Sequence, residues 1–386
     1  MTQYVQQFSI DYNFPVCFTE SLFSVENPTF LSTVQRLETD KRHRIMVIVD
    51  SNVAASHPRL ISEIDAYAAA FPTKLELVAP PLVVQGGEVC KNDFAHVVNI
   101  IEQVNLHSMD RQSFVVVIGG GALLDMACFA TAIAHRGIRT IRVPTTVLGQ
   151  GDSGVGVKNG INFFGKTNFI GTFLPPFAVL NDTTFIETLE HRDKIAGIAE
   201  GVKVALLRDP QFFEYLEHHH RELAQAEPAA LQYVIRQTAD LHLRHIRERG
   251  DPFELGSSRP LDYGHWSAHK LESMTGHQVR HGEAVAIGMA LDVLYAVNKG
   301  YLPHAGAERI LNLLEQLGFQ LWHEKVGEPA LIAGIQEFRE HLGGKLHITL
   351  LRDVGIPFEV HEMDEGVIRQ SIAGLRERSQ VSATAK

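Results

Sequence analysis

Three short segments in the second half of the chain carry side chains that commonly bind divalent metals. Glu200 stands in AGIAEGVK, His265 in DYGHWSAHKLE and His281 in RHGEAVAIGM. One carboxylate and two imidazoles, with a coordination position left open, form a common catalytic zinc site. The spacing alone is weak evidence, because the chain contains 20 histidines and a single His265 is more often a structural residue than a ligand.

Further polar groups stand beside these three residues. Lys203 follows Glu200, His269 follows His265, and Glu283 follows His281. Glu283 has two interpretations: it orients a metal ligand from outside the coordination sphere, or it pairs with Arg280.

A glycine triplet marks a candidate phosphate-binding turn in the first half. Gly119, Gly120 and Gly121, followed by Asp125, come directly after the apolar run FVVVI and open the helical pattern ALLDMACFA. Glycines in this place let backbone amides approach a pyrophosphate, and the helix N-terminus adds positive potential. The segment is not a GxGxxG fingerprint, and a lone glycine triplet is about as often a tight turn that binds nothing.

Polar and glycine-rich groups at other strand ends favour the nucleotide interpretation. These groups are Asp50 and Asn52, then Gly86, Gly87, Glu88 and Lys91 in a second glycine turn, and finally Thr145 and Thr146. All of them fall at the expected carboxyl ends of strands, where a nucleotide lies in a doubly wound sheet.

The segment 151–173 is a second candidate for ligand binding. It combines six glycines with Asp152, Lys158, Asn162, Lys166 and Asn168. The alternative to ligand binding is a solvated glycine-rich loop without a ligand. Ammonium groups, amide side chains and a flexible backbone suit a phosphorylated or polyhydroxylated ligand, so we favour ligand binding here.

The elements that position these residues differ between the two halves of the chain. Apolar runs at 45–50, 114–121, 141–146 and 177–182 alternate with helical patterns at 58–71 and 123–135. This alternation predicts an α/β domain with a mainly parallel sheet. From about Glu190 onward, amphipathic stretches at 212–226, 229–249, 282–299 and 305–317 predict a helical domain. We place the boundary near 188, which gives domains at 1–188 and 189–386.

Composition excludes several classes of protein. At 386 residues and 45% hydrophobic content, the chain is expected to form two or three folded domains and is not intrinsically disordered. Its net charge of −10 opposes a role on nucleic acids or anionic membranes. Three scattered cysteines, with no leader pattern and no long apolar segment, indicate a cytoplasmic protein without a disulfide framework or a membrane span.

Together these segments resemble the dehydroquinate synthase-like sugar phosphate cyclases. GGGALLD resembles the family's GGGxxxD nucleotide turn, RGIRTIRVPTT its RGxxxxxxPTT, and DSGVGVKNGIN its DSSVGGKTGIN. AEGVK, GHWSAHKLE and HGEAVAIGM resemble its AExxK, GHxxGHxxE and HGEAVAIGM. The similarity runs in consistent order from about Asp50 to about Leu350.

The resemblance implies a fold and a set of site residues. It implies an NAD-binding, Rossmann-like α/β domain at 1–188, an all-α metal-binding domain at 189–386, and a homodimer. The implied ligands of a zinc or cobalt ion are Glu200, His265 and His281. The implied NAD contacts are Asp50, Asn52, Glu88, Lys91, Gly120, Gly121, Asp125, Thr145, Thr146 and Thr188. The implied substrate contacts are Arg136, Asp152, Lys166, Asn168 and Asp262, and the implied catalytic groups are Lys158, Lys203, Glu254 and His269.

The resemblance also implies a reaction. NAD oxidises one hydroxyl of a sugar phosphate, phosphate leaves by elimination, and NADH returns its hydride. The ring then opens, and an intramolecular aldol step closes a carbocycle. NAD is therefore catalytic and is not consumed. The metal polarises adjacent oxygens, and lysines stabilise the leaving phosphate.

Departures from the family pattern bear on the substrate. Dehydroquinate synthases usually read like LRxLLNxGH before the metal-binding histidine, with an Arg and an Asn at the substrate carboxylate. This chain reads GSSRPLDYGH, which puts Ser258 and Asp262 at those positions. An acidic Asp262 opposes a carboxylate and suits a hydroxyl-rich substrate end. The alternative is a shifted carboxylate contact through Arg259 or Lys345.

Three segments, GDPFE, RPLDYGHWSAHKLE and the VGVKNGIN loop, resemble the 2-epi-5-epi-valiolone synthase-like branch, whose substrate is sedoheptulose 7-phosphate. They also resemble a related cyclase encoded in bacterial ebo clusters. We therefore expect a cyclase of a heptulose 7-phosphate that forms a valiolone-type product. The alternatives are 3-dehydroquinate synthase, a metal-dependent polyol dehydrogenase, and an NAD-binding scaffold without catalysis. Lys158, Lys166 and Lys203 count against the dehydrogenase, because a substrate without phosphate does not require them.

Overall fold

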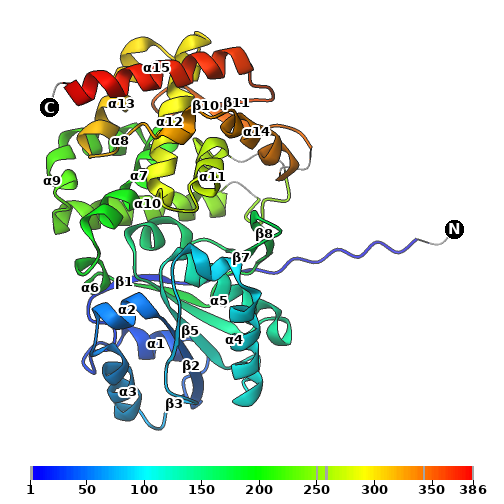
Figure 1. Ribbon diagram of the computed structural model, residues 1–386. Helices are drawn as coiled ribbons and strands as arrows, with labels where there is room; N and C mark the ends of the chain where they lie inside the picture. Colours follow the sequence, from blue (N-terminus) through cyan, green and yellow to red (C-terminus); the bar gives the residue numbers. More distant parts are fainter. Residues whose placement is uncertain (1–2, 249–250, 257–259, 342–343, 385–386) are drawn as a thin grey trace.

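The computed structural model describes residues 3–248, 251–256, 260–341 and 344–384. A sheet-containing half and a helical half are stacked, and the N-terminal segment runs out from the body in an extended form (Figure 1). In the described parts of the chain, no helix combines the length and the apolar character needed to cross a bilayer.

A seven-stranded parallel sheet organises the first half. Its strands are β1 (Val16–Thr19), β2 (His43–Asp50), β3 (Leu75–Leu77), β4 (Leu82–Val84), β5 (Phe114–Gly119), β6 (Arg139–Pro144) and β9 (Ala178–Asp182). The order across the sheet is β1-β9-β6-β5-β2-β3, with β4 also paired to β2. The predicted α/β domain with a mainly parallel sheet is confirmed.

Helices cover both faces of this sheet, which explains why its central strands are apolar throughout. The helices of this half are α1 (Thr29–Gln35), α2 (Ser51–Ser56), α3 (Leu60–Ala70), α4 (Phe94–Leu106), α5 (Gly121–Ile133) and α6 (Thr184–Glu187). In β5, Val115 and Val117 pack with α4 and α5, while Phe114, Val116 and Ile118 pack with α1 and α3. All six residues of β5 are buried.

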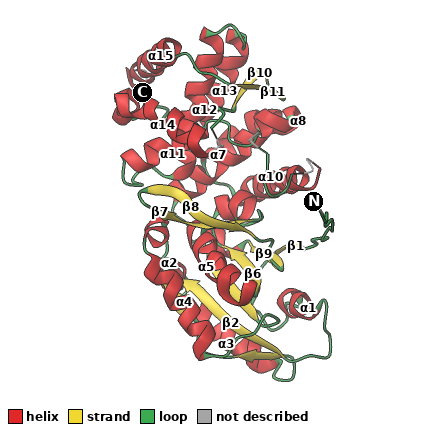
Figure 2. Ribbon diagram, turned by 90° about the vertical axis from the view of Figure 1, so that its right-hand side faces the viewer, coloured by secondary structure: helices red, strands yellow, loops and turns green. Residues whose placement is uncertain are grey.

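The glycine-rich segment 151–173 is more ordered than its composition suggests. Most of it forms an antiparallel hairpin, β7 (Lys158–Phe163) and β8 (Lys166–Phe173), which lies between the two halves (Figure 2). Phe164 and Gly165 have positive φ angles of 51° and 71° and form the turn. These residues therefore do not form the solvated loop that was the alternative to ligand binding.

A buried arginine anchors the approach to this hairpin. Arg142 of β6 is 1% exposed. Its guanidinium donates to the carbonyls of Gly154 (3.2 Å), Gly156 (2.8 Å) and Lys158 (3.1 Å) and to Oδ1 of Asn159 (2.6 Å). The sheet thereby fixes the position of Lys158.

The second half is built mainly of helices around one apolar core. They are α7 (His191–Arg208), α8 (Pro210–His218), α9 (His220–Ala224), α10 (Pro228–Glu248), α11 (His265–Met274), α12 (His281–Asn298), α13 (His304–Gln316), α14 (Pro329–His341) and α15 (Glu365–Thr384). The helices expected at 229–249, 282–299 and 305–317 are present. The stretch expected at 212–226 is divided into α8 and α9, because His219 leaves helical geometry with φ −106° and ψ 19°.

The second half was expected to be all-α, and this expectation is wrong. A second antiparallel hairpin is formed by β10 (Ile348–Asp353) and β11 (Ile356–Val360), joined by a turn at Gly355 with φ 78°. Ile348, Leu350 and Leu351 are buried in the helical core. The hairpin therefore contributes apolar side chains that a helix would otherwise supply.

Candidate active site

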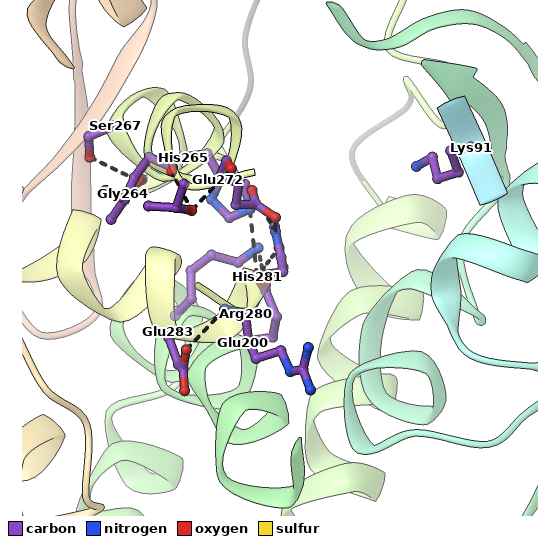
Figure 3. Close-up of polar contacts among 12 residues, drawn as sticks. Lys91, Glu200, Gly264, His265, Ser267, Glu272, Arg280, His281 and Glu283 are labelled. Atoms are coloured by element: carbon purple, nitrogen blue, oxygen red, sulfur yellow. Dashed lines mark hydrogen bonds and ion pairs between the residues drawn. The ribbon is translucent and has the colours of Figure 1, made fainter. Parts of the chain in front are cut away.

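The three predicted metal ligands meet in the second half, where the first residues of two helices face the middle of a third. Glu200 lies in α7, His265 is the first residue of α11, and His281 is the first residue of α12 (Figure 3). Nε2 of His265 lies 3.6 Å from Oε1 of Glu200, and Nε2 of His281 lies 3.3 Å from the same oxygen. Two ligands of a tetrahedral zinc ion, each about 2.0–2.1 Å from it, are about 3.3 Å apart, so this spacing suits a metal.

The hydrogen bonds of the two imidazoles leave the facing nitrogens available. Nδ1 of His265 donates to the carbonyl oxygen of Tyr263 at 3.0 Å, and Nδ1 of His281 donates to Glu272 at 3.2 Å. Each Nε2 therefore carries a lone pair toward Glu200 when the ring is neutral. Glu200 is 0% exposed, and neither of its carboxylate oxygens has a well-formed hydrogen bond among the described residues. A buried carboxylate facing two nitrogen lone pairs fits a divalent cation.

The electrostatics of this cluster also suit a cation. Burial raises the pKa of Glu200, but the Lys203 ammonium and the two imidazoles outweigh burial and hold that pKa well below its ordinary value. Lys203 is buried and forms an ion pair with Glu200. Burial lowers the pKa of His281, whereas Glu272 and Glu200 raise it further than burial lowers it. A metal at Nε2 would displace that proton, so we expect metal binding to release a proton.

Glycines allow the ligand-bearing helices to touch at the backbone. A Cβ atom on Gly282 would lie 1.8 Å from the carbonyl oxygen of Ala196, so α12 rests on α7 one turn before Glu200. A Cβ on Gly288 would lie 2.0 Å from the carbonyl oxygen of Gly264, which has φ 77° and precedes His265. These two contacts set how closely the helices that carry the three predicted ligands approach one another.

Glu272 is a site residue that the sequence interpretation missed. Both of its oxygens lie 3.2 Å from Nδ1 of His281, the arrangement that orients a metal-bound imidazole. Glu283 does not have this role. It forms two short contacts with Arg192, at 2.6 and 2.7 Å, and accepts from the backbone N–H of Arg280 at 2.9 Å. The signal for Glu272 was present, because it is the last residue of the segment GHWSAHKLE.

Several predicted substrate and catalytic residues lie around the cluster. Asp152 interacts electrostatically with Glu200 and Lys203. Its Oδ1 lies 2.7 Å from Nδ1 of His242 in α10, a neighbour that sequence reasoning did not identify because no motif surrounds it. Nζ of Lys158 lies 2.6 Å from Oε1 of Glu254.

Asp262 and His269 complete this group. Burial raises the pKa of Asp262, but its interactions with the Lys158 ammonium, the His265 imidazole and the Lys203 ammonium outweigh burial, so the net shift is downward. Burial and the neighbouring His265 lower the pKa of His269 to about 3. Asp262 is therefore ionised and His269 is neutral near pH 7.

Three predicted substrate contacts lie apart from this group. Arg136 is exposed in the turn between α5 and β6, at the amino edge of the sheet. Lys166 is 55% exposed and pairs with Glu340 of α14 at 3.2 Å. Asn168 is exposed in β8, and its backbone N–H donates to Asn162. Ser258 and Arg259 lie outside the described residues, and Lys345 is exposed.

The predicted nucleotide residues gather at the carboxyl edge of the sheet. Asp50 ends β2, and its Oδ1 accepts from the backbone N–H of Asn52 at 2.8 Å. A Cβ on Gly86 would lie 1.8 Å from Oδ2 of Asp50, so the second glycine turn rests on this carboxylate. Nζ of Lys91 lies 2.8 Å from Oδ2 of Asp125, which lies in α5. Figure 3 shows Lys91 on a segment separate from the metal cluster.

The remaining predicted NAD contacts lie in the neighbouring turns and helices. Glu88 is half-buried in the turn that contains Lys91, and Gly120 and Gly121 open α5. The N–H of Thr145 donates to the carbonyl of Gly119 at 3.0 Å, and Oγ1 of Thr146 accepts from the N–H of Gly149 at 2.9 Å. Oγ1 of Thr188 lies 2.8 Å from Nε2 of His57, beyond α2.

Family models and known proteins resemble this chain over most of its length. The model for the 3-dehydroquinate synthase N-terminal domain matches residues 81–196, and the model for its C-terminal domain matches residues 197–340. A 3-dehydroquinate synthase of Streptococcus pyogenes is 34% identical over 277 residues, which cover 72% of this chain and 73% of the relative.

Two solved structures extend the comparison. A 2-epi-5-epi-valiolone synthase from Streptomyces hygroscopicus subsp. jinggangensis, with NAD+ and Zn2+ bound, superposes with a TM-score of 0.86 at 26% identity, covering 97% of this chain and all of the other. A 2-deoxy-scyllo-inosose synthase complexed with carbaglucose-6-phosphate, NAD+ and Co2+ gives a TM-score of 0.76 at 24% identity, covering 93% of this chain and 96% of the other. At that identity, the second structure supports the fold alone.

Proposed function

The chain belongs to the 3-dehydroquinate synthase family, and from this premise we propose that it is a sugar phosphate cyclase that acts on sedoheptulose 7-phosphate. In this proposal the enzyme depends on NAD and on a zinc or cobalt ion. It converts the heptulose phosphate to a valiolone-type carbocycle and releases inorganic phosphate. The valiolone synthase that shares the fold at 26% identity binds NAD+ and Zn2+, which supports both cofactors.

The observation that carries the substrate proposal is the ionised Asp262 beside the cluster. Its carboxylate is held in the charged form chiefly by the ammonium groups of Lys158 and Lys203. A second carboxylate about 4 Å away would be repelled by about 4 kcal/mol at an effective dielectric constant of about 20. That repulsion corresponds to a factor of about a thousand in binding. Hydroxyl groups, in contrast, can donate hydrogen bonds to Asp262, which favours a substrate end without a carboxylate.

The residues around the cluster fit the demands of this chemistry. Glu200, His265 and His281 would hold the metal, which polarises oxygens bound to it, and the carboxyl edge of the sheet would hold NAD. Glu200 and Asp152 raise the pKa of Lys203 further than burial lowers it, so this ammonium remains charged and can stabilise an oxyanion.

Two further residues have proposed roles at the phosphate. The ammonium of Lys158, fixed near Glu254, suits a phosphate group. Neutral His269 can accept a proton, and an anionic phosphate beside it would raise its pKa.

The second candidate function is 3-dehydroquinate synthase, which is the name of the relative at 34% identity. This function requires another cation that binds the substrate carboxylate and offsets its repulsion by Asp262. A polyol dehydrogenase is less well supported, because its substrate carries no phosphate and would not require the cations Lys158 and Lys203.

We also propose three features of the organisation of this protein: a domain boundary near 188, a homodimer, and a cytoplasmic location.

Phosphate release by the purified protein tests the proposed function. The protein, with NAD and zinc or cobalt, is given either sedoheptulose 7-phosphate or 3-deoxy-arabino-heptulosonate 7-phosphate. We expect phosphate from the first substrate without accumulation of NADH. Release from the second substrate alone would replace our proposal with 3-dehydroquinate synthase, and net NADH formation without phosphate release would indicate a dehydrogenase.

A further inference from the structure

A second group of metal-binding side chains lies at the open end of the β10–β11 hairpin. His347 directly precedes β10, Glu359 lies in β11, and His361 directly follows β11. The strand register pairs Ile348 with Val360 and Thr349 with Glu359, so His347 stands opposite His361. Glu359 and His361 are two residues apart and point to the same face of the strand. All three side chains therefore share one face.

Distances bring these side chains within reach of one ion. Nδ1 of His347 lies 3.0 Å from Oε2 of Glu359, and the two imidazole rings have centroids 4.7 Å apart. One ligand atom from each of the three residues lies within 4.8 Å of the other two. These separations require only small side-chain movements to reach the spacing of about 3.3 Å expected around zinc.

The hydrogen bonds of the two rings leave donor atoms for a metal. Nδ1 of His361 donates to the carbonyl oxygen of Leu346 at 3.0 Å, which leaves its Nε2 as a lone-pair donor in the neutral ring. Nε2 of His347 is buried and has no hydrogen-bond partner in the described parts of the chain. A buried polar atom without a partner is costly unless a ligand satisfies it.

We propose that His347, Glu359 and His361 bind a second divalent transition-metal ion, with zinc as the best fit. Two imidazoles and one carboxylate are ligands typical of zinc, whereas magnesium and calcium prefer oxygen ligands alone. The His347 and Glu359 side chains are 12% and 29% exposed, and His361 is exposed, so water can complete the coordination. The ion would join the two ends of the hairpin that enter and leave the helical core.

This site is independent of the Glu200 centre and of the proposed function. The ligands of the first centre come from α7, α11 and α12, while those of the second come from the hairpin ends, and the two sets share no residue. Loss of one site should therefore leave the other occupied. This separation allows each site to be tested alone.

The proposal is tested by measuring the number of zinc ions bound per chain. The full-length protein is equilibrated in a zinc buffer, passed through gel filtration and analysed by mass spectrometry. We expect two ions in the wild type, one in His361→Ala, one in Glu359→Gln and one in His265→Ala. The double variant His265→Ala/His361→Ala should hold none. His218→Ala is the matched control, because His218 is an exposed histidine whose ring donates to the carbonyl of Glu214, and it should retain two ions.

The outcomes separate this inference from the first centre. If His361→Ala and Glu359→Gln bind as much zinc as the wild type, the second site does not exist. A single ion in the wild type that is lost in His265→Ala would also refute it. A single ion that survives in His265→Ala and disappears in His361→Ala would support the second site and overturn the Glu200 centre. Circular dichroism of each variant verifies that it is folded. If His361→Ala does not fold, the isosteric variant Glu359→Gln still tests the second site.

Discussion

Replacing Glu272 with glutamine is expected to weaken metal binding at the Glu200 centre without unfolding it. The carboxylate of Glu272 accepts from Nδ1 of His281, with both oxygens at 3.2 Å. It thereby holds the ring so that Nε2 faces Glu200, and its charge raises the basicity of that nitrogen. Glutamine keeps an oxygen acceptor of the same size and removes only the charge.

The magnitude follows from the kind of hydrogen bond that is lost. A hydrogen bond to a charged partner contributes about 1.5–3 kcal/mol, and a neutral one about 0.5–1.5 kcal/mol. The middle values of these ranges differ by about 1.2 kcal/mol, which corresponds to a loss of zinc affinity of about eightfold. Glu272→Leu removes the acceptor as well and leaves Nδ1 without a partner, so a loss of about a hundredfold is expected, the upper end for residues that support a metal ligand.

The assay is a competitive titration of zinc against a chromophoric chelator. All variants carry His361→Ala, so that only the Glu200 centre is titrated. Glu283→Gln is the matched control, because Glu283 lies two residues after His281 but contacts Arg192 and the backbone of Arg280. Its zinc affinity should remain within about twofold of the parent protein.

Two results would refute this reasoning. If Glu272→Gln and Glu283→Gln bound zinc equally well, the contact between Glu272 and His281 would not support the ligand. If Glu283→Gln bound zinc more weakly than Glu272→Gln, the carboxylate of Glu283 would be the group that orients His281.

Three other changes test different parts of the structure. Arg142→Met removes the donor to three backbone carbonyls and should lower the free energy of unfolding by about 3 kcal/mol or more, measured by urea denaturation. Asp262→Asn removes the repelling charge and should raise phosphate release from the carboxylate-bearing heptulosonate relative to sedoheptulose 7-phosphate, by about tenfold or more; an unchanged ratio would argue against a role in substrate choice. Burial lowers the pKa of His245 to about 4, so the unfolded chain takes up a proton below pH 6.5 that the folded chain does not. The free energy of unfolding should therefore fall as the pH drops from 6.5 to 4. In His245→Gln its dependence on pH should be smaller, by an amount that corresponds to up to about one proton taken up on unfolding.

The sequence predicted those features that are carried by long apolar runs or by local motifs. FVVVIG is apolar on both strand faces, so β5 and its place in a covered parallel sheet were foreseeable. Glu200, His265 and His281 were found because each stands in its own recognisable segment. The strands β3 and β4 have three residues each, which is too short for a periodic pattern to show.

The features that escaped prediction depend on contacts or on mixed signals. The interaction of His242 with Asp152 joins residues 90 positions apart, and no local pattern marks either as a partner of the other. The hairpin at 158–173 was hidden because its glycines and lysines also suit a ligand-binding loop. The β10–β11 hairpin follows a long run of helical patterns, and its apolar residues resemble one more buried helix face.

The backbone contacts at Gly282 and Gly288 have a consequence for how this enzyme can evolve. Because α12 touches α7 and the turn before α11 without intervening side chains, even an added methyl group would push the ligand-bearing helices apart. Selection for a new substrate therefore cannot adjust the width of the metal site in small steps through these positions. A change of substrate is therefore more easily made in the loops that reach the site from outside, such as the segment that contains Asp262.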